Sequence, residues 1–160
     1  MKKCLSFLVA MMLLVGFSSQ ARAGGNDAKL DAAMKMLQGK VGALGAPSLS
    51  NDVLKFGTTK INGNFDIVDE VGKANECVST IFMKKGTDFE RVATNIVKEG
   101  KRAIGTKLAL ESPAFTPSTK GEPFKGPADI LGKKYDTFYS PIKDASGAVI
   151  GIYIVGVKID

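Results

Sequence analysis

The stretch AVIGIYIVGVK, residues 148–158, carries apolar side chains at almost every position. As a β-strand it would place Ile150, Ile152 and Ile154 on one face, and it would place a second apolar set on the other: Val149, Tyr153, Val155 and Val157. A strand that is apolar on both faces has to be covered on both. This stretch therefore predicts the middle strand of a sheet packed between two layers.

Strand and turn signals continue outward from this stretch. Residues 143–147 form a strong turn directly before it, and residues 84–88 have the chemistry of a hairpin, in which Gly86 can supply positive φ. Several segments around these turns have the β-branched or alternating composition of short strands, and we predict strands at residues 77–83, 89–97, 127–131 and 134–142.

Residues 27–44 have the apolar spacing of an amphipathic helix, with side chains three and four positions apart: Leu30, Ala33, Met34, Leu37, Val41 and Leu44. Asn26 or Asp27 is the expected N-cap, and Gly45 followed by Pro47 ends the helix. The apolar stripe has two interpretations. It packs on its own domain, or it is the seam of a homodimer.

The remaining segments are short. Residues 53–60 are a predicted first strand, residues 65–74 a short helix, and residues 98–102 a polar turn before an extended piece at 103–108. Repeated prolines and glycines in residues 111–127 leave room for at most one short helix.

These elements predict an α+β fold with an antiparallel sheet of five or six short strands. Each apolar face has to be buried against another layer. We therefore expect the long N-terminal helix to cover one face, and residues 103–126 to cover the other with a cavity beneath them.

The N-terminus has the pattern of a secretory signal peptide. Lys2 and Lys3 precede an apolar run at residues 5–17, and Ala21-Arg22-Ala23 has the small residues of a cleavage site. The run is shorter than the roughly 20 residues that span a bilayer. We expect cleavage after Ala23, which removes three of the 22 basic residues and none of the 16 acidic ones, so the formal charge falls from +6 to +3.

Two residue types limit the chemistry. The chain has no His, which excludes Ser-His-Asp and Cys-His catalysis, His-ligated zinc and c-type haem. Cleavage would remove Cys4 and leave Cys77 as the only thiol, either buried as a small hydrophobe or bridged to another molecule. We predict no metal and no cofactor. No run of like charges is present, so nucleic acid is not a predicted partner.

Residues 68–108 and 121–159 closely resemble the single Cache sensor domain found in the periplasmic part of bacterial chemoreceptors. The resemblance is carried by the motifs TIF, FERVATN, GTKL, GEPFKG, DILGKKY and PIKDASGAVIG. It extends over roughly residues 54–159.

The resemblance implies a PAS-like extracellular fold that binds a small metabolite, such as an organic acid or amino acid, between its sheet and covering loops. It also implies signalling through flanking membrane helices. Because the sequence ends at Asp160, we expect a stand-alone periplasmic sensor that acts with a separate membrane receptor or histidine kinase in signal transduction or chemotaxis. The expected parts are a signal peptide (1–23), an N-terminal helix and linker (24–52) and the sensor domain (53–160).

Two cations are candidates for holding an anionic ligand. Arg91 stands in a strand that otherwise reads as interior, and Lys107 stands in the extended piece beside the expected cavity. An Arg offers a two-pronged donor for a carboxylate. The competing interpretation is that Arg91 caps a sheet edge or pairs with a surface acid, and that Lys107 is solvated. Four further residues could add hydroxyl donors or an apolar wall: Thr94, Phe124, Tyr135 and Tyr139.

Two other functions remain as alternatives. One is a structural or interaction module with a filled cavity that dimerises through its N-terminal helix. The other is an enzyme, for which the sequence offers only neighbouring acids at Asp66, Asp69 and Glu70, a weak cation site at best. Because no nucleophile stands beside a base, catalysis is not predicted.

Overall fold

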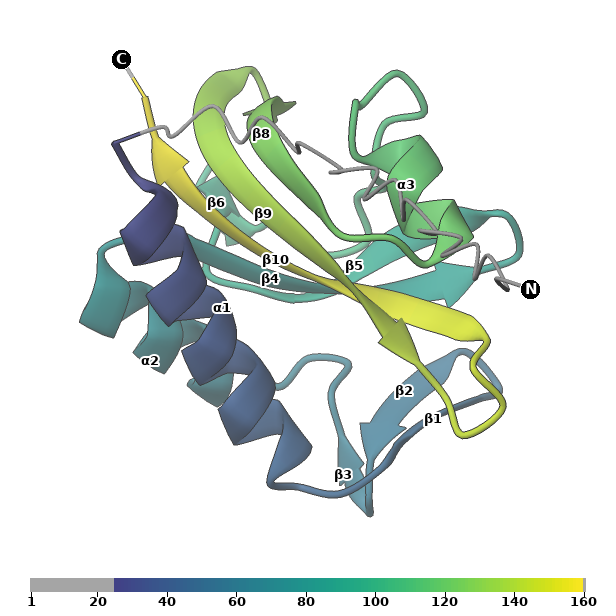
Figure 1. Ribbon diagram of the computed structural model, residues 1–160. Helices are drawn as coiled ribbons and strands as arrows, with labels where there is room; N and C mark the ends of the chain where they lie inside the picture. The colour runs from purple at the N-terminus through teal and green to yellow at the C-terminus, as the bar shows by residue number, and fades with distance from the viewer. Residues whose placement is uncertain (1–24, 160) are drawn as a thin grey trace, which may run out of the picture.

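The computed structural model describes residues 25–159, so the predicted signal peptide, its cleavage site and Cys4 lie outside the described residues. The centre is a five-stranded antiparallel sheet in the order β5-β4-β10-β9-β8 (Figure 1). Its strands are β4 (Val78–Lys85), β5 (Asp88–Thr94), β8 (Phe124–Ile130), β9 (Lys133–Lys143) and β10 (Val149–Lys158). The α+β class and the central position of β10 are confirmed.

A β-bulge near the start of β10 changes which layer two side chains face. The register with β9 shifts between Val149 and Gly151. Ile150 consequently packs in the cluster on the helix side, while Val149 packs in the cluster on the opposite side. The predicted facing is wrong for these two residues and right from Ile152 onward, because one extra residue in a strand reverses the alternation beyond it.

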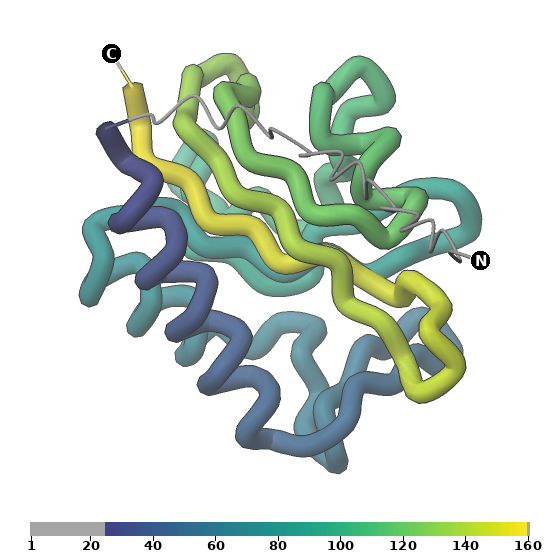
Figure 2. The backbone as a smooth tube through the Cα atoms, in the orientation of Figure 1, coloured from purple at the N-terminus to yellow at the C-terminus, as the bar shows by residue number. Residues whose placement is uncertain are grey.

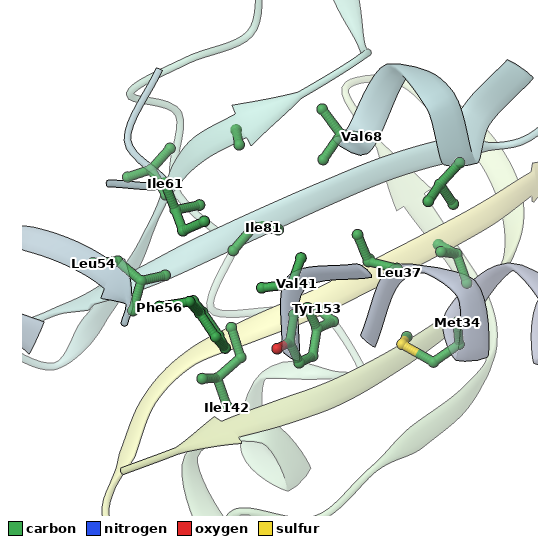
Figure 3. Close-up of a cluster of buried hydrophobic side chains, with 14 of the residues drawn as sticks. Met34, Leu37, Val41, Leu54, Phe56, Ile61, Val68, Ile81, Ile142 and Tyr153 are labelled. Atoms are coloured by element: carbon green, nitrogen blue, oxygen red, sulfur yellow. The ribbon is translucent and has the colours of Figure 1, made fainter. Parts of the chain in front are cut away.

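Two helices cover one face of the sheet, α1 (Asp27–Gly42) and α2 (Asp66–Asn75) (Figures 1 and 2). The predicted apolar stripe of α1 is buried in the larger core cluster, where Figure 3 shows Met34, Leu37 and Val41 together with Ile81 and Tyr153. The stripe thus packs on its own domain. Asn26 stands at the N-cap position without a capping side-chain bond.

A small sheet follows α1, where a loop and one strand were predicted. It contains β1 (Pro47–Ser50), β2 (Val53–Phe56) and β3 (Thr59–Lys60), in that order. The predicted strand 53–60 is therefore broken at Gly57, whose φ is +57° and where an added Cβ would meet the Leu44 carbonyl oxygen at 2.2 Å. Only Gly fits such a position.

The opposite face of the sheet is covered by the predicted cover segment, residues 103–126. It contains α3 (Phe115–Lys120), the one short helix that the prolines allowed. Its beginning runs beside β5, since Arg91 donates its backbone N–H to the Thr106 carbonyl at 2.8 Å. Before it, β6 (Val97–Lys98) and β7 (Lys101–Arg102) form a separate hairpin, so the strand predicted for residues 89–97 ends earlier.

Candidate ligand-binding site

A bulge in β5 brings two predicted site residues onto the face under the cover segment. The pairing of β4 with β5 shifts between Ile81 and Phe82, which leaves Val92 and Ala93 both in the helix-side cluster. Arg91 and Thr94, three positions apart, consequently lie on the same face of the sheet. In a regular strand they would point to opposite faces.

Arg91 is buried on this face, with 5% of its surface exposed. Its guanidinium lies over the Phe82 ring at 4.8 Å and donates to the Thr106 hydroxyl, while its Nε has no hydrogen-bond partner among the described residues. No carboxylate within residues 25–159 forms an ion pair with it. Burial lowers the pKa of Arg91 to about 10. A buried cation without an anion is costly, and a bound anion would relieve that cost.

Tyr139 lies close enough to Arg91 for each to affect the other's pKa. It is 1% exposed, and burial raises its pKa to about 12 against the opposing hydrogen bonds from Ser112 and Thr137. The neutral phenol persists at physiological pH. Phe124 meets the Tyr139 ring edge-on at a centroid distance of 6.0 Å.

Two further predicted residues lie on the same face, nearer the end of the sheet. The Thr94 hydroxyl is buried and lies 2.7 Å from the Thr80 hydroxyl, so each has a hydrogen-bond partner already. Tyr135 lies near the start of β9, is 8% exposed and lines a cavity there.

Lys107 does not lie beside the cavity, which corrects the placement expected from the sequence. Its side chain is 61% exposed and its Nζ lies 2.6 Å from the Asp88 carboxylate. The extended piece that carries it pairs with the outer edge of β5 through the bridge between Glu90 and Lys107. At that edge the side chain of Lys107 points away from the covered face into solvent.

The space under the cover segment is occupied by apolar side chains of both layers, including Phe82 and Phe89 from the sheet and Leu108 and Ala114 from the cover. A cavity of about 310 Å³ lies at the end of the sheet. It is bounded by residues 95–99, which follow β5, and by the β8–β9 turn. We call it the end cavity. The apolar packing beneath residues 103–126 corrects the expectation of a hollow there.

Two side chains connect the region of the end cavity to neighbouring elements, Asn95 to the start of β4 and Arg102 to helix α2. Asn95 accepts the Ser79 N–H at 2.8 Å and donates to the Cys77 carbonyl at 3.0 Å. Arg102 binds Asp69 of α2 with both nitrogens, at 2.6 and 2.7 Å, and also donates to the Thr94 carbonyl at 2.8 Å. A shift of this region would therefore also displace α2, because the Arg102–Asp69 ion pair joins them.

Two of the three acids considered for catalysis are paired with separate cations, Asp69 with Arg102 and Glu70 with Lys40. The Arg102 guanidinium lowers the pKa of Asp69, and Glu70 forms an ion pair with Lys40 at 2.7 Å. Among the described residues, no three or more His, Cys, Asp or Glu side chains gather as a metal site.

Short hydroxyl side chains on the covered face escaped the sequence analysis. Thr80 and Thr137 are buried at inward positions of strands β4 and β9, and Ser118 of α3 is buried with no partner for its hydroxyl among the described residues. A polar residue in an inward strand position is a signal that could have found the two threonines. No signal of this kind marks Ser118, because its burial depends on how α3 docks.

Comparison with known proteins places the chain in a family. Its sequence matches the Cache 3/Cache 2 fusion domain over residues 19–160. A search of curated proteins gives no significant match. Within residues 25–159, no helix has the length and apolar character needed to cross a membrane. Cache domains are extracellular sensors of small molecules and are typically without enzymatic activity. The covered antiparallel sheet and the match over nearly the whole sequence agree, and the chain belongs to the Cache family of sensor domains.

Proposed function

We propose that this protein is an exported sensor that binds a small carboxylate, an organic acid or amino acid, at Arg91. The observation that carries the proposal is the burial of the Arg91 guanidinium with its Nε unpaired and no acid beside it in the described residues. Isolated charges are seldom buried, since their desolvation costs several kcal/mol. A carboxylate ligand would accept hydrogen bonds from the guanidinium and replace the missing counter-charge.

The neighbouring groups suit such a ligand. Tyr139 supplies a neutral hydroxyl, and Phe82 and Phe124 supply apolar surface against which a short carbon chain can pack. Pockets for small molecules combine apolar walls with a few polar groups in this way. Binding requires the cover segment to move outward, because apolar side chains now fill the space beneath it. Ligand uptake would therefore change the shape of the covered face.

Thermal unfolding of the purified protein with a panel of mono- and dicarboxylic acids and amino acids tests the proposal. A compound present at 100 times its Kd should add about 2.7 kcal/mol of stability. Arg91→Met should abolish that stabilisation. Without ligand, the same variant should be as stable as the wild type or more stable, because an apolar side chain of similar volume replaces an unpaired buried charge.

Lys107→Met is the matched control, because it removes a cation from the neighbouring segment that is exposed and paired with Asp88. This variant should respond to ligand like the wild type. Stabilisation that persists in Arg91→Met, or a panel without any stabilising compound, would contradict the proposal.

We propose further that the sensor acts with a separate membrane receptor or histidine kinase in signal transduction or chemotaxis. The support is a link from β5, the strand that carries Arg91, to α2: Arg102 donates to the Thr94 carbonyl and binds Asp69 of α2. Cross-linking of the protein to a receptor or kinase, in an amount that changes when ligand is added, would support this role. Cross-linking in the same amount with and without ligand would contradict it.

A further inference from the structure

The walls of the end cavity combine apolar and polar groups in about equal share. Its apolar lining comes from β4, from the segment after β5, and from the β8–β9 hairpin: Val78, Ile96, Val97, Ile130, Leu131 and Tyr135. Its volume of about 310 Å³ is at the lower end of the range for small-molecule sites. Arg91 and Tyr139 are not among its lining residues. The end cavity is therefore a place separate from the site at Arg91.

Two lysines add positive charge to this apolar lining. Lys98 comes from the β6–β7 hairpin and Lys133 from the β8–β9 hairpin, and both are exposed. Neither forms an ion pair with another described residue. Glu99 is the acid among the described lining residues. Lys101, the strand partner of Lys98, and Lys134 add positive charge nearby, and Asp129 of the β8–β9 hairpin adds one negative charge. The balance at this end is positive, which favours anions.

The turn of each hairpin at the end cavity contains a residue other than Gly with positive φ. Glu99 and Leu131 have φ of 52° and 53°, and each is followed by a Gly with positive φ. Two-residue turns of this type favour Asn or Asp before Gly, because side chains such as Leu are strained there. At Leu131 this strain places a large apolar side chain in the cavity wall. Val97, another apolar lining residue, is 58% exposed and offers apolar surface that a bound group could cover.

We propose that the end cavity is a second binding site, which takes an amphipathic monocarboxylate. The apolar body of the ligand would lie against Leu131, Val97 and Tyr135, and its carboxylate would lie between Lys98 and Lys133. Burial of the apolar body supplies affinity. The lysines supply preference for an anionic head over a neutral one, and salt weakens that contribution because they are exposed.

Octanoate is the probe, and 1-octanol is its neutral counterpart. Isothermal titration of the wild-type protein at low salt should show octanoate binding more tightly than 1-octanol, with affinity that falls as salt is added. Lys98→Glu combined with Lys133→Glu should weaken octanoate binding by about tenfold or more, since each attraction becomes a repulsion. Lys35→Glu combined with Lys55→Glu is the control for net charge. These exposed lysines stand on α1 and β2, and their replacement should leave the affinity within about twofold.

Leu131→Asn separates binding from folding. Asn suits the turn better than Leu, so the variant should unfold at a higher temperature than the wild type and yet bind octanoate several-fold more weakly. A variant that is more stable cannot owe its lost affinity to misfolding. Unchanged octanoate affinity in Leu131→Asn and in the double lysine variant would overturn the proposal.

Arg91→Met distinguishes this site from the site of the proposed function. Octanoate should bind this variant as it binds the wild type, and loss of octanoate binding would assign the probe to Arg91 and overturn the second site. Phosphatidylglycerol vesicles test whether the site takes a free acid or the surface of a lipid bilayer, which also combines apolar chains with anionic groups. Retention of the protein on vesicles without binding of monomeric octanoate would also overturn the proposal.

Discussion

The thiol of Cys77 is partly shielded from solvent, which makes it less reactive. Cys77 is half-buried at the end of α2, where its Sγ lies 3.9 Å from the Val71 carbonyl oxygen. Burial raises its pKa to about 11, although the positive charge of Lys29 opposes the shift. The thiolate is the reactive form of cysteine, so this environment makes the thiol slow to react.

The thiol should therefore react with a chromogenic disulfide reagent about a hundredfold more slowly at pH 8 in the native protein than in urea, a difference that follows from the two-unit rise from 9.0 to about 11. Between pH 8 and 10 the native rate should rise about tenfold per pH unit, because the thiolate fraction grows in that proportion below the pKa. Equal rates in the native and unfolded protein, or rapid formation of a disulfide-linked dimer, would show instead that Cys77 is accessible.

At the scale of elements, α2 and the segment after β5 approach each other closely at Gly72. A Cβ added to Gly72 of α2 would stand 2.0 Å from Nδ2 of Asn95 and 2.9 Å from the Cys77 carbonyl oxygen. The same Asn95 amide joins the start of β4 to the end of β5. A helix glycine that is ordinarily unfavourable is thus required here by packing.

Gly72→Ala should consequently lower the free energy of unfolding by about 1–3 kcal/mol, as overpacked cores do. Gly39→Ala is the matched control, because Gly39 stands in α1 with nothing within 4 Å of an added Cβ. That control should raise the free energy of unfolding by up to about 1 kcal/mol, the helix propensity difference. Urea denaturation measures both, and a destabilised Gly39→Ala paired with an unaffected Gly72→Ala would contradict the close packing described here.

At the scale of the whole molecule, the start of α1 and the end of β10 lie side by side at one end of the sheet (Figures 1 and 2). The Asn26 side chain donates to the Asp136 carboxylate at 2.7 Å, and the Ile159 N–H donates to the Lys134 carbonyl at 3.1 Å. The end cavity, lined by Lys133, lies at this same end. A ligand bound there would lie close to both ends of the described chain.

The predicted signal peptide leads to a test at the scale of the whole chain. We expect the exported protein to begin at Gly24, because Ala21 and Ala23 are the small residues that a signal peptidase requires. N-terminal sequencing and intact mass of the exported protein measure this. Ala23→Phe should leave the precursor uncleaved, whereas Ala10→Leu, within the apolar run, should be processed normally. A mature protein that retains residues 1–23 would contradict the prediction.

The amino-acid sequence alone was sufficient for the elements that rest on long, regular patterns. The apolar stripe of α1, the two-sided apolar strand β10 and the prolines of the cover segment each specify a structure locally, because period and backbone chemistry leave few alternatives. The helix was expected to run to residue 44 and ends at Gly42, where the backbone turns toward β1. The family followed from motifs spread over most of the chain.

Tertiary structure alone decided where individual side chains lie. The bulge in β5 places Arg91 and Thr94 on one face of the sheet. The bulge in β10 exchanges the faces on which Val149 and Ile150 lie. Pairing of residues 103–108 with the edge of β5 leaves the side chain of Lys107 in solvent. Likewise, the end cavity is enclosed by segments far apart in the sequence. A bulge or an edge contact depends on which strand lies alongside, so no pattern within a single segment could specify it.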